Sequence, residues 1–165
     1  MAGMFPTFVA DPNDRNRRFH GKVGPTWPAS LRAAYYVALA GAVLLLLTGM
    51  LMLASGAPKD ANAEFAQAFT TNMRIVAGLD ILLGLAIAGC AAFFERGAKR
   101  ARRVFAAAVA VAVFVNMAGF FIGVAGWAAF AVTLVLVAAL FLAFRPAANA
   151  YVDERSGDLW RSVEG

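Results

Sequence analysis

The sequence predicts an all-α integral membrane protein, a bundle of four transmembrane helices with both termini in the cytoplasm. Three observations lead to this fold class. Hydrophobic residues make up 61% of the 165-residue chain, whereas soluble domains are roughly 45–50% apolar. These residues fall into four uninterrupted runs, and a run of about 18 or more crosses the hydrocarbon core of a bilayer as a helix. Lys and Arg are unequally shared between the segments that join the runs, which sets the orientation.

The four runs divide the chain into three parts. Residues 1–28 form a polar cytoplasmic arm, residues 29–146 a four-helix transmembrane domain, and residues 147–165 a cytoplasmic tail. The predicted spans cover residues 31–54, 73–94, 104–122 and 127–144. The first run exceeds the roughly 7–15 apolar residues of a signal-peptide core, so we interpret it as a retained span.

Positive charge lies mainly on one predicted side of the membrane. The segment up to Arg32, the loop between the second and third spans, and the segment from Arg145 onward together carry thirteen Lys and Arg residues, and the opposite side carries Lys59 and Arg74. Because positively charged loops stay in the cytoplasm, both termini and the middle loop are predicted to be cytoplasmic, in an inner (plasma) membrane. The net charge of +5 then follows from topology, and no nucleic-acid partner is predicted.

Residues 55–72 form the largest external segment of this topology. Phe65 and Phe69 are four residues apart and would share one face of a short helix, for which Asp60 is a candidate N-cap. A helix on the outer membrane surface and a partly ordered loop are both compatible with this segment.

Few residues offer catalytic or metal chemistry. The single histidine, His20, lies in the arm, and the single cysteine, Cys90, has no nearby partner in the sequence. Neither a glycine-rich phosphate loop nor a Ser/His/acid set is visible, so we predict no catalytic residue, no metal, no cofactor and no enzymatic activity. Thioether ligands suit copper(I), but we interpret the four scattered methionines of the outer half as packing residues: Met50, Met52, Met73 and Met117.

Asp80 is the exceptional residue, because it lies inside the second span. A carboxylate at membrane depth costs on the order of 3 kcal/mol and faces a protein interior rather than lipid. The helical rise of about 1.5 Å per residue gives a similar depth, roughly 9–10 Å from the outer interface, for Asn116, Thr48 and Thr133. We therefore predict a polar layer in which Asp80 and Asn116 are hydrogen-bonded neighbours, while the threonines bond to carbonyls of their own helices. A structural role and a proton- or ligand-binding role for Asp80 both remain open.

Small residues accompany this polar pair. Gly84 and Ala88 lie near the helical stripe of Asp80, and Asn116 shares a stripe with Gly119 and Gly123. The Gly119-x-x-x-Gly123 spacing lets two membrane helices approach closely. We therefore expect the second and third spans to form the tight pair of the bundle, and the first and fourth spans to be more peripheral.

The middle loop is strongly basic. Topology is sufficient to explain its charge, and the alternative is contact with anionic lipid or an acidic partner. The residues of this candidate contact are Arg96, Lys99, Arg100, Arg102 and Arg103.

The Ala-, Val-, Gly- and Arg-rich composition and the four-span plan resemble small membrane proteins of actinobacteria. Some of those proteins are accessory subunits of respiratory supercomplexes or of cell-envelope machinery. The resemblance concerns the layout of the whole chain and rests on no family motif, so no functional residue is transferred from it.

Together with the small size and the small-residue faces, this resemblance implies a non-catalytic accessory or assembly subunit of a larger membrane complex. Its expected partners are other membrane subunits and anionic lipids. The alternative is a small oligomeric transporter or channel component that uses Asp80.

Overall fold

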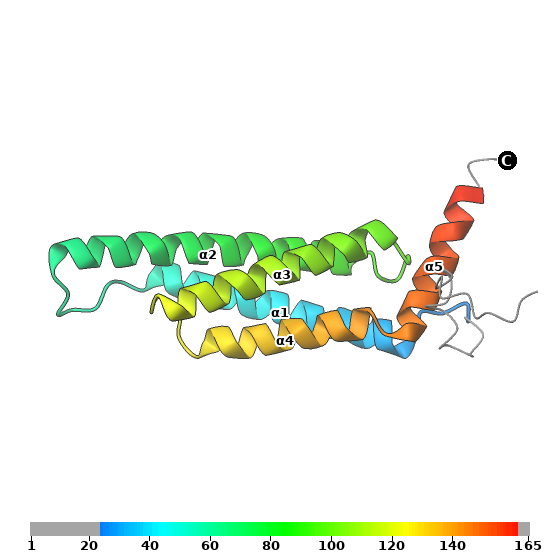
Figure 1. Ribbon diagram of the computed structural model, residues 1–165, viewed down its shortest axis with the longest axis horizontal. Coiled ribbons are helices and arrows are strands. Elements are labelled where there is room, and N and C mark those ends of the chain that lie inside the picture. The colour runs from blue at the N-terminus through cyan, green and yellow to red at the C-terminus, as the bar shows by residue number, and fades with distance from the viewer. Residues whose placement is uncertain (1–23, 162–165) are drawn as a thin grey trace, which may run out of the picture.

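The computed structural model describes residues 24–161, with side chains described for residues 24–156. This part of the chain is all-α and contains no strand. Its five helices are α1 (Ala29–Ala54), α2 (Ala63–Ala91), α3 (Lys99–Phe121), α4 (Ala128–Ala143) and α5 (Pro146–Arg161) (Figure 1). The predicted arm, residues 1–28, lies mostly outside the described residues.

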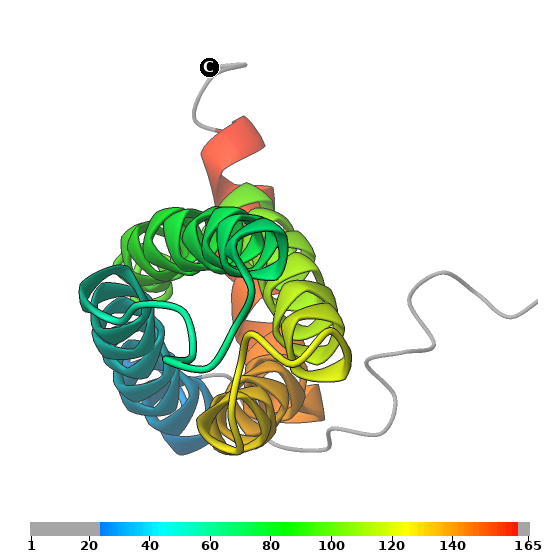
Figure 2. The same cartoon turned by 90° about the vertical axis from the view of Figure 1, so that its left-hand side faces the viewer.

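Helices α1 to α4 run side by side in alternating directions and form a ring in chain order, so that α4 returns to lie beside α1 (Figure 2). Helix α5 leaves the end of α4 with a bend of 59° and crosses one end of the bundle. We call the end of the bundle that α5 crosses the basic end. It consists of the start of α1, the α2–α3 loop with the first turns of α3, and α5. We call the opposite end, with the α1–α2 and α3–α4 connections, the turn end.

Within the described residues, α1, α2 and α3 are each long and apolar enough to cross a membrane, and α4 meets that test only together with α5 as a bent pair. At 1.5 Å per residue, the 16 residues of α4 span roughly 24 Å, somewhat less than a hydrocarbon core of about 30 Å. The outer surface carries bulky apolar side chains that are more than half exposed, including Leu47, Leu82, Phe114 and Leu134. Three to four helices of this kind are consistent with a multi-pass membrane protein.

Helix α2 begins ten residues before the predicted span, at Ala63. Asn62 is its N-cap, because the Asn62 Oδ1 accepts a hydrogen bond of 2.8 Å from the backbone N–H of Phe65. The Asp60 cap was therefore a wrong prediction. Phe65 and Phe69 do share a helix face, with ring centroids 5.9 Å apart, but they belong to the first turns of α2 rather than to a separate helix.

Helix α1 is not peripheral, contrary to the sequence-based expectation, because it makes the most extensive contacts in the bundle, with α2 and α4. Two glycines allow the close approach. A Cβ at Gly49 would lie 2.9 Å from the carbonyl oxygen of Ala77 in α2, and a Cβ at Gly41 would lie 2.7 Å from Leu136 Cδ2 in α4.

The predicted small-residue stripes pack differently from the expected α2–α3 pairing. Gly84 faces α1, where a Cβ would lie 3.0 Å from the carbonyl oxygen of Ala42. Ala88 is half-buried and packs against the larger cluster of buried apolar side chains inside the bundle. Gly119 does meet α2, because a Cβ there would lie 3.3 Å from Val76. Gly123 follows the end of α3 with a φ of +76°, a conformation that glycine adopts without strain. Gly123 is therefore a turn residue and not a packing residue.

The methionines are dispersed. Met73 is buried in a small apolar cluster with Val76, Val115 and Val124, and Met52 packs at its edge. Met50 faces outward. This dispersion agrees with their interpretation as packing residues.

We expect Gly49→Ala to destabilise the bundle, because the new methyl group would press on the α2 backbone at Ala77. Overpacking of this kind costs about 1–3 kcal/mol. The matched control is Gly89→Ala, where a Cβ would meet no atom of the described chain within 4 Å. Thermal unfolding in a mild detergent should show a lower midpoint for Gly49→Ala only. Equal midpoints for the two variants would contradict the close α1–α2 contact.

Candidate functional site: a buried polar layer and a docked helix

The polar layer centres on one hydrogen bond between α2 and α3. The Asn116 Nδ2 donates to Asp80 Oδ1 over 2.8 Å, and the two side chains are 1% and 0% exposed. The same Nδ2 donates to the carbonyl oxygen of Ala112 over 3.0 Å. Both amide protons are thus used, and a flipped amide would place its oxygen against the Ala112 carbonyl. The amide orientation is therefore fixed, and Asp80 is the acceptor.

Helix α1 covers Asp80 from a second side. A Cβ at Gly49 would lie 3.5 Å from the Cβ of Asp80, so the α1 backbone packs closely against α2 at the position of Asp80. The sequence reasoning missed Gly49 because it sought small residues beside the polar pair on α2 and α3 only. The signal was present, since Gly49 is next to Thr48, which already lay in the predicted layer.

The two threonines of the layer behave differently from each other. The Thr48 hydroxyl donates to carbonyl oxygens of its own helix, those of Leu44 at 2.8 Å and Leu45 at 3.1 Å, as expected. The Thr133 hydroxyl is buried and has no hydrogen-bond partner among the described residues, so its predicted bond to its own helix is absent. Neither threonine bonds to Asp80 or Asn116 in the part of the chain that is described.

Three buried oxygens of this layer have no hydrogen-bond partner within the described chain: Asp80 Oδ2, Asn116 Oδ1 and Thr133 Oγ1. An unsatisfied buried polar atom costs about 1–3 kcal/mol, and an internal water is its usual partner. The described residues contain no group of three or more His, Cys, Asp and Glu side chains that would hold a metal ion. The chemistry of the layer is therefore that of a single carboxylate beside neutral acceptors.

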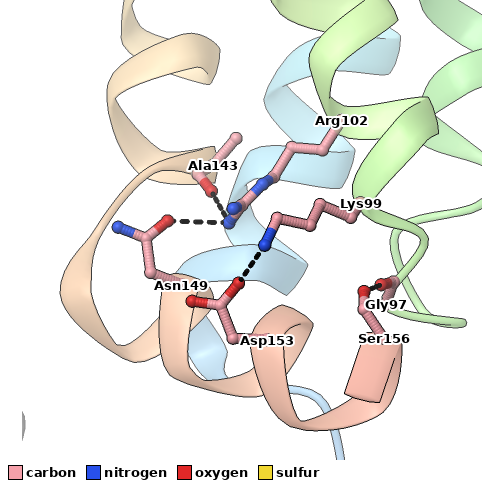
Figure 3. A network of polar contacts seen from close by, with 7 residues as sticks. All are labelled: Gly97, Lys99, Arg102, Ala143, Asn149, Asp153 and Ser156. Atoms are coloured by element: carbon pink, nitrogen blue, oxygen red, sulfur yellow. Dashed lines mark hydrogen bonds and ion pairs between the residues drawn. The ribbon is translucent and has the colours of Figure 1, made fainter. Parts of the chain in front are cut away.

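A second group of polar contacts fixes α5 at the basic end (Figure 3). Its central residue is Arg102 of α3, only 6% exposed. The Arg102 Nη1 donates to Asn149 Oδ1 over 2.8 Å and to the Ala143 carbonyl oxygen over 3.4 Å. The guanidinium carbon also lies 4.6 Å from the ring centroid of Phe144, within cation–π range. Arg102 is thus engaged inside the chain, which corrects its prediction as a lipid or partner contact.

Further contacts join α5 to the α2–α3 loop. The Tyr151 hydroxyl donates to the Glu95 carbonyl oxygen over 2.8 Å, and the Ser156 hydroxyl donates to the Gly97 carbonyl oxygen over 3.3 Å (Figure 3). Lys99 Nζ lies 3.0 Å from Asp153 Oδ1, but with side chains 44% and 40% exposed this ion pair contributes little. Burial of Ala148, Tyr151 and Val152 adds an apolar contact beneath these bonds.

The sequence reasoning described residues 147–165 as a polar tail and missed the docked part of α5. Two signals were present. Pro146 begins the helix at a position where a missing N–H costs nothing, and Ala148, Tyr151 and Val152 are spaced as one helical face. Of the five basic residues predicted to contact lipid or a partner, Arg96, Arg100 and Arg103 are exposed, and Lys99 is exposed but paired with Asp153.

A double-mutant cycle with Asp80→Ala and Asn116→Ala should give a coupling free energy of about 0.6–2 kcal/mol, the range for interhelical polar contacts in membranes. The measurement is reversible unfolding in detergent. The matched control is a cycle of Asp80→Ala with Thr48→Val, because the Thr48 hydroxyl bonds only within its own helix among the described residues. A coupling of the control pair as large as that of the Asp80–Asn116 pair would contradict the assigned hydrogen bond.

Comparisons of this chain with models of known protein families, with curated proteins and with solved structures give no match.

Proposed function

We propose that this chain is a non-catalytic accessory or assembly subunit of a larger membrane complex. All four helices α1 to α4 cross the membrane in this proposal, and the basic end lies in the cytoplasm. The excess of Lys and Arg in the segments that meet at the basic end supports that orientation.

The observation that carries the proposal is the docking of α5. The buried Arg102–Asn149 hydrogen bond of 2.8 Å and the Tyr151–Glu95 contact of 2.8 Å give the basic end a defined shape. A polar helix of 16 residues held across the end of a membrane bundle is a surface that a partner subunit can recognise. The basic end also carries exposed arginines at positions 96, 100 and 103. These arginines favour an acidic partner surface.

The packing inside the helix bundle supports the same proposal. Asp80 and Asn116 are bonded to each other and buried, and Gly49 brings the α1 backbone against α2 at Asp80. Such a layer fixes the register of α2 against α3, which is what a rigid membrane scaffold requires.

We expect at least one other membrane subunit to co-purify with the wild-type chain from native membranes in mild detergent. Arg102→Met should lose most of that partner, because it removes a charge-assisted hydrogen bond worth about 1.5–3 kcal/mol and releases α5. Arg74→Met is the matched control, since it removes the same charge from an exposed residue in the half of α2 nearer the turn end. The readout is partner recovery identified by mass spectrometry, with the thermal midpoint of each variant as a check on folding.

Purification of the wild type as a lone monomer would contradict the proposed function. Equal losses for Arg102→Met and Arg74→Met would instead assign partner recovery to net charge and not to the docked helix.

A small transporter or channel component that uses Asp80 is the second candidate. It is favoured by the three buried oxygens that have no partner among the described residues, Asp80 Oδ2, Asn116 Oδ1 and Thr133 Oγ1. These atoms could accept hydrogen bonds from a water molecule or from a protonated group in transit.

For this second candidate, Asp80→Asn should abolish proton or solute flux into proteoliposomes while leaving the thermal midpoint nearly unchanged, because the amide has the shape of the carboxylate. Thr48→Val is the matched control, with its hydroxyl engaged in its own helix. Flux that is equal in the wild type, Asp80→Asn and protein-free vesicles would rule the transporter out.

A further inference from the structure

An apolar groove lies between α3 and α4 near the basic end. It has a volume of about 750 Å³ and is lined by Ala106, Val137, Leu140, Phe141, Phe144, Arg145 and Pro146. That volume falls within the range of roughly 300–1,000 Å³ that is typical of ligand sites. The α3–α4 contact is the least extensive of the four contacts around the ring, and the small side chain of Ala106 leaves the space between the helices unfilled.

The groove opens toward the surrounding solvent or lipid. Phe141 is 67% exposed, and Val137 and Phe144 are also partly exposed. These residues belong to the last turns of α4 and its C-cap. If α4 crosses a bilayer, they lie where the upper part of a lipid chain meets its headgroup. An acyl chain laid along the helices would cover the exposed faces of Val137 and Phe141.

Arg145 is the charged residue among those that line this groove. The guanidinium carbon of Arg145 lies over the ring of Phe141, 5.6 Å from the ring centroid, within cation–π range. The edge of a guanidinium carries its N–H groups, which bind phosphate in a bidentate manner. Arg103 is exposed and lies three residues before Ala106, on the same helical stripe, so a second cation is available on the α3 side.

We propose that this groove is a binding site for one anionic phospholipid, with its phosphate at Arg145 and an acyl chain along Val137, Leu140 and Phe141. Charge complementarity decides the occupant, because the only charge that lines the groove is positive. The site is independent of the proposed accessory function and requires only that α3 and α4 lie in a bilayer.

Native mass spectrometry of the detergent-purified chain, titrated with phosphatidylglycerol or with phosphatidylcholine of the same acyl chains, tests this site. We expect one phosphatidylglycerol to be retained at least about tenfold more tightly than phosphatidylcholine. Both lipids carry the phosphate, but the quaternary ammonium of phosphatidylcholine cancels the negative charge and is repelled by the Arg145 guanidinium. Arg145→Gln should remove that preference. Ala106→Phe should fill the groove and weaken the retention of both lipids while the charge remains.

The matched control is Arg96→Gln. The guanidinium carbon of Arg96 lies 5.4 Å from the ring centroid of Phe93, so it has the same cation–π arrangement, but it does not line the groove. Arg96→Gln should retain phosphatidylglycerol like the wild type, and comparable thermal midpoints would show that all variants are folded. Equal losses in Arg96→Gln and Arg145→Gln, or an unchanged retention in Ala106→Phe, would overturn the site. A second polypeptide in place of lipid at this groove would overturn it as well.

Discussion

A polar side chain inside a helix bundle must find its hydrogen-bond partner within that bundle, because neither lipid nor apolar side chains can provide one. The arrangement of this chain depends on meeting that requirement between α2 and α3. Asp80 and Asn116 are almost completely buried and joined over 2.8 Å. A shift of either helix by one turn would leave a carboxylate and an amide without partners. The register of the two helices is thereby fixed, and α1 can approach over Gly49.

The same requirement operates at the basic end. Arg102 is buried, and its contacts with Asn149, Ala143 and Phe144 connect α3 to the end of α4 and to α5. The docked helix and the polar layer are thus two consequences of one constraint. The surface that remains outside carries exposed apolar side chains along the bundle and exposed arginines at its basic end. Both proposed interactions, with a partner subunit and with an anionic lipid, use that outer surface.

Hydropathy predicted where the apolar helices lie and placed the beginnings of α1 and α4 within two residues, but it missed the beginnings of α2 and α3. The first ten residues of α2, from Ala63 to Asn72, include Gln67, Thr70 and Thr71, which read as a loop by hydropathy although the backbone is helical. The Asp80–Asn116 contact could be predicted because burial of a carboxylate demands a partner at equal depth.

The docking of α5 could not be predicted from charge. The buried Arg102 and its exposed neighbours Arg100 and Arg103 are all arginines, so residue type does not distinguish them. Only their helical positions separate them. The central place of α1 was missed for a similar reason, since glycines such as Gly41 and Gly49 are informative only when the facing helix is known.

The central claim is that the polar layer is closed by helix packing and does not line a water-filled path. Cysteine labelling tests this claim most directly. Ala112 is fully buried one turn from Asn116, and only its backbone oxygen takes part in the layer. Ala112→Cys in a Cys90→Ala background should resist a water-soluble thiol reagent in native membranes and react only after denaturation. Gly126→Cys, in the exposed turn between α3 and α4, should react at once. Rapid labelling of Ala112→Cys in native membranes, at a rate near that of Gly126→Cys, would contradict the claim.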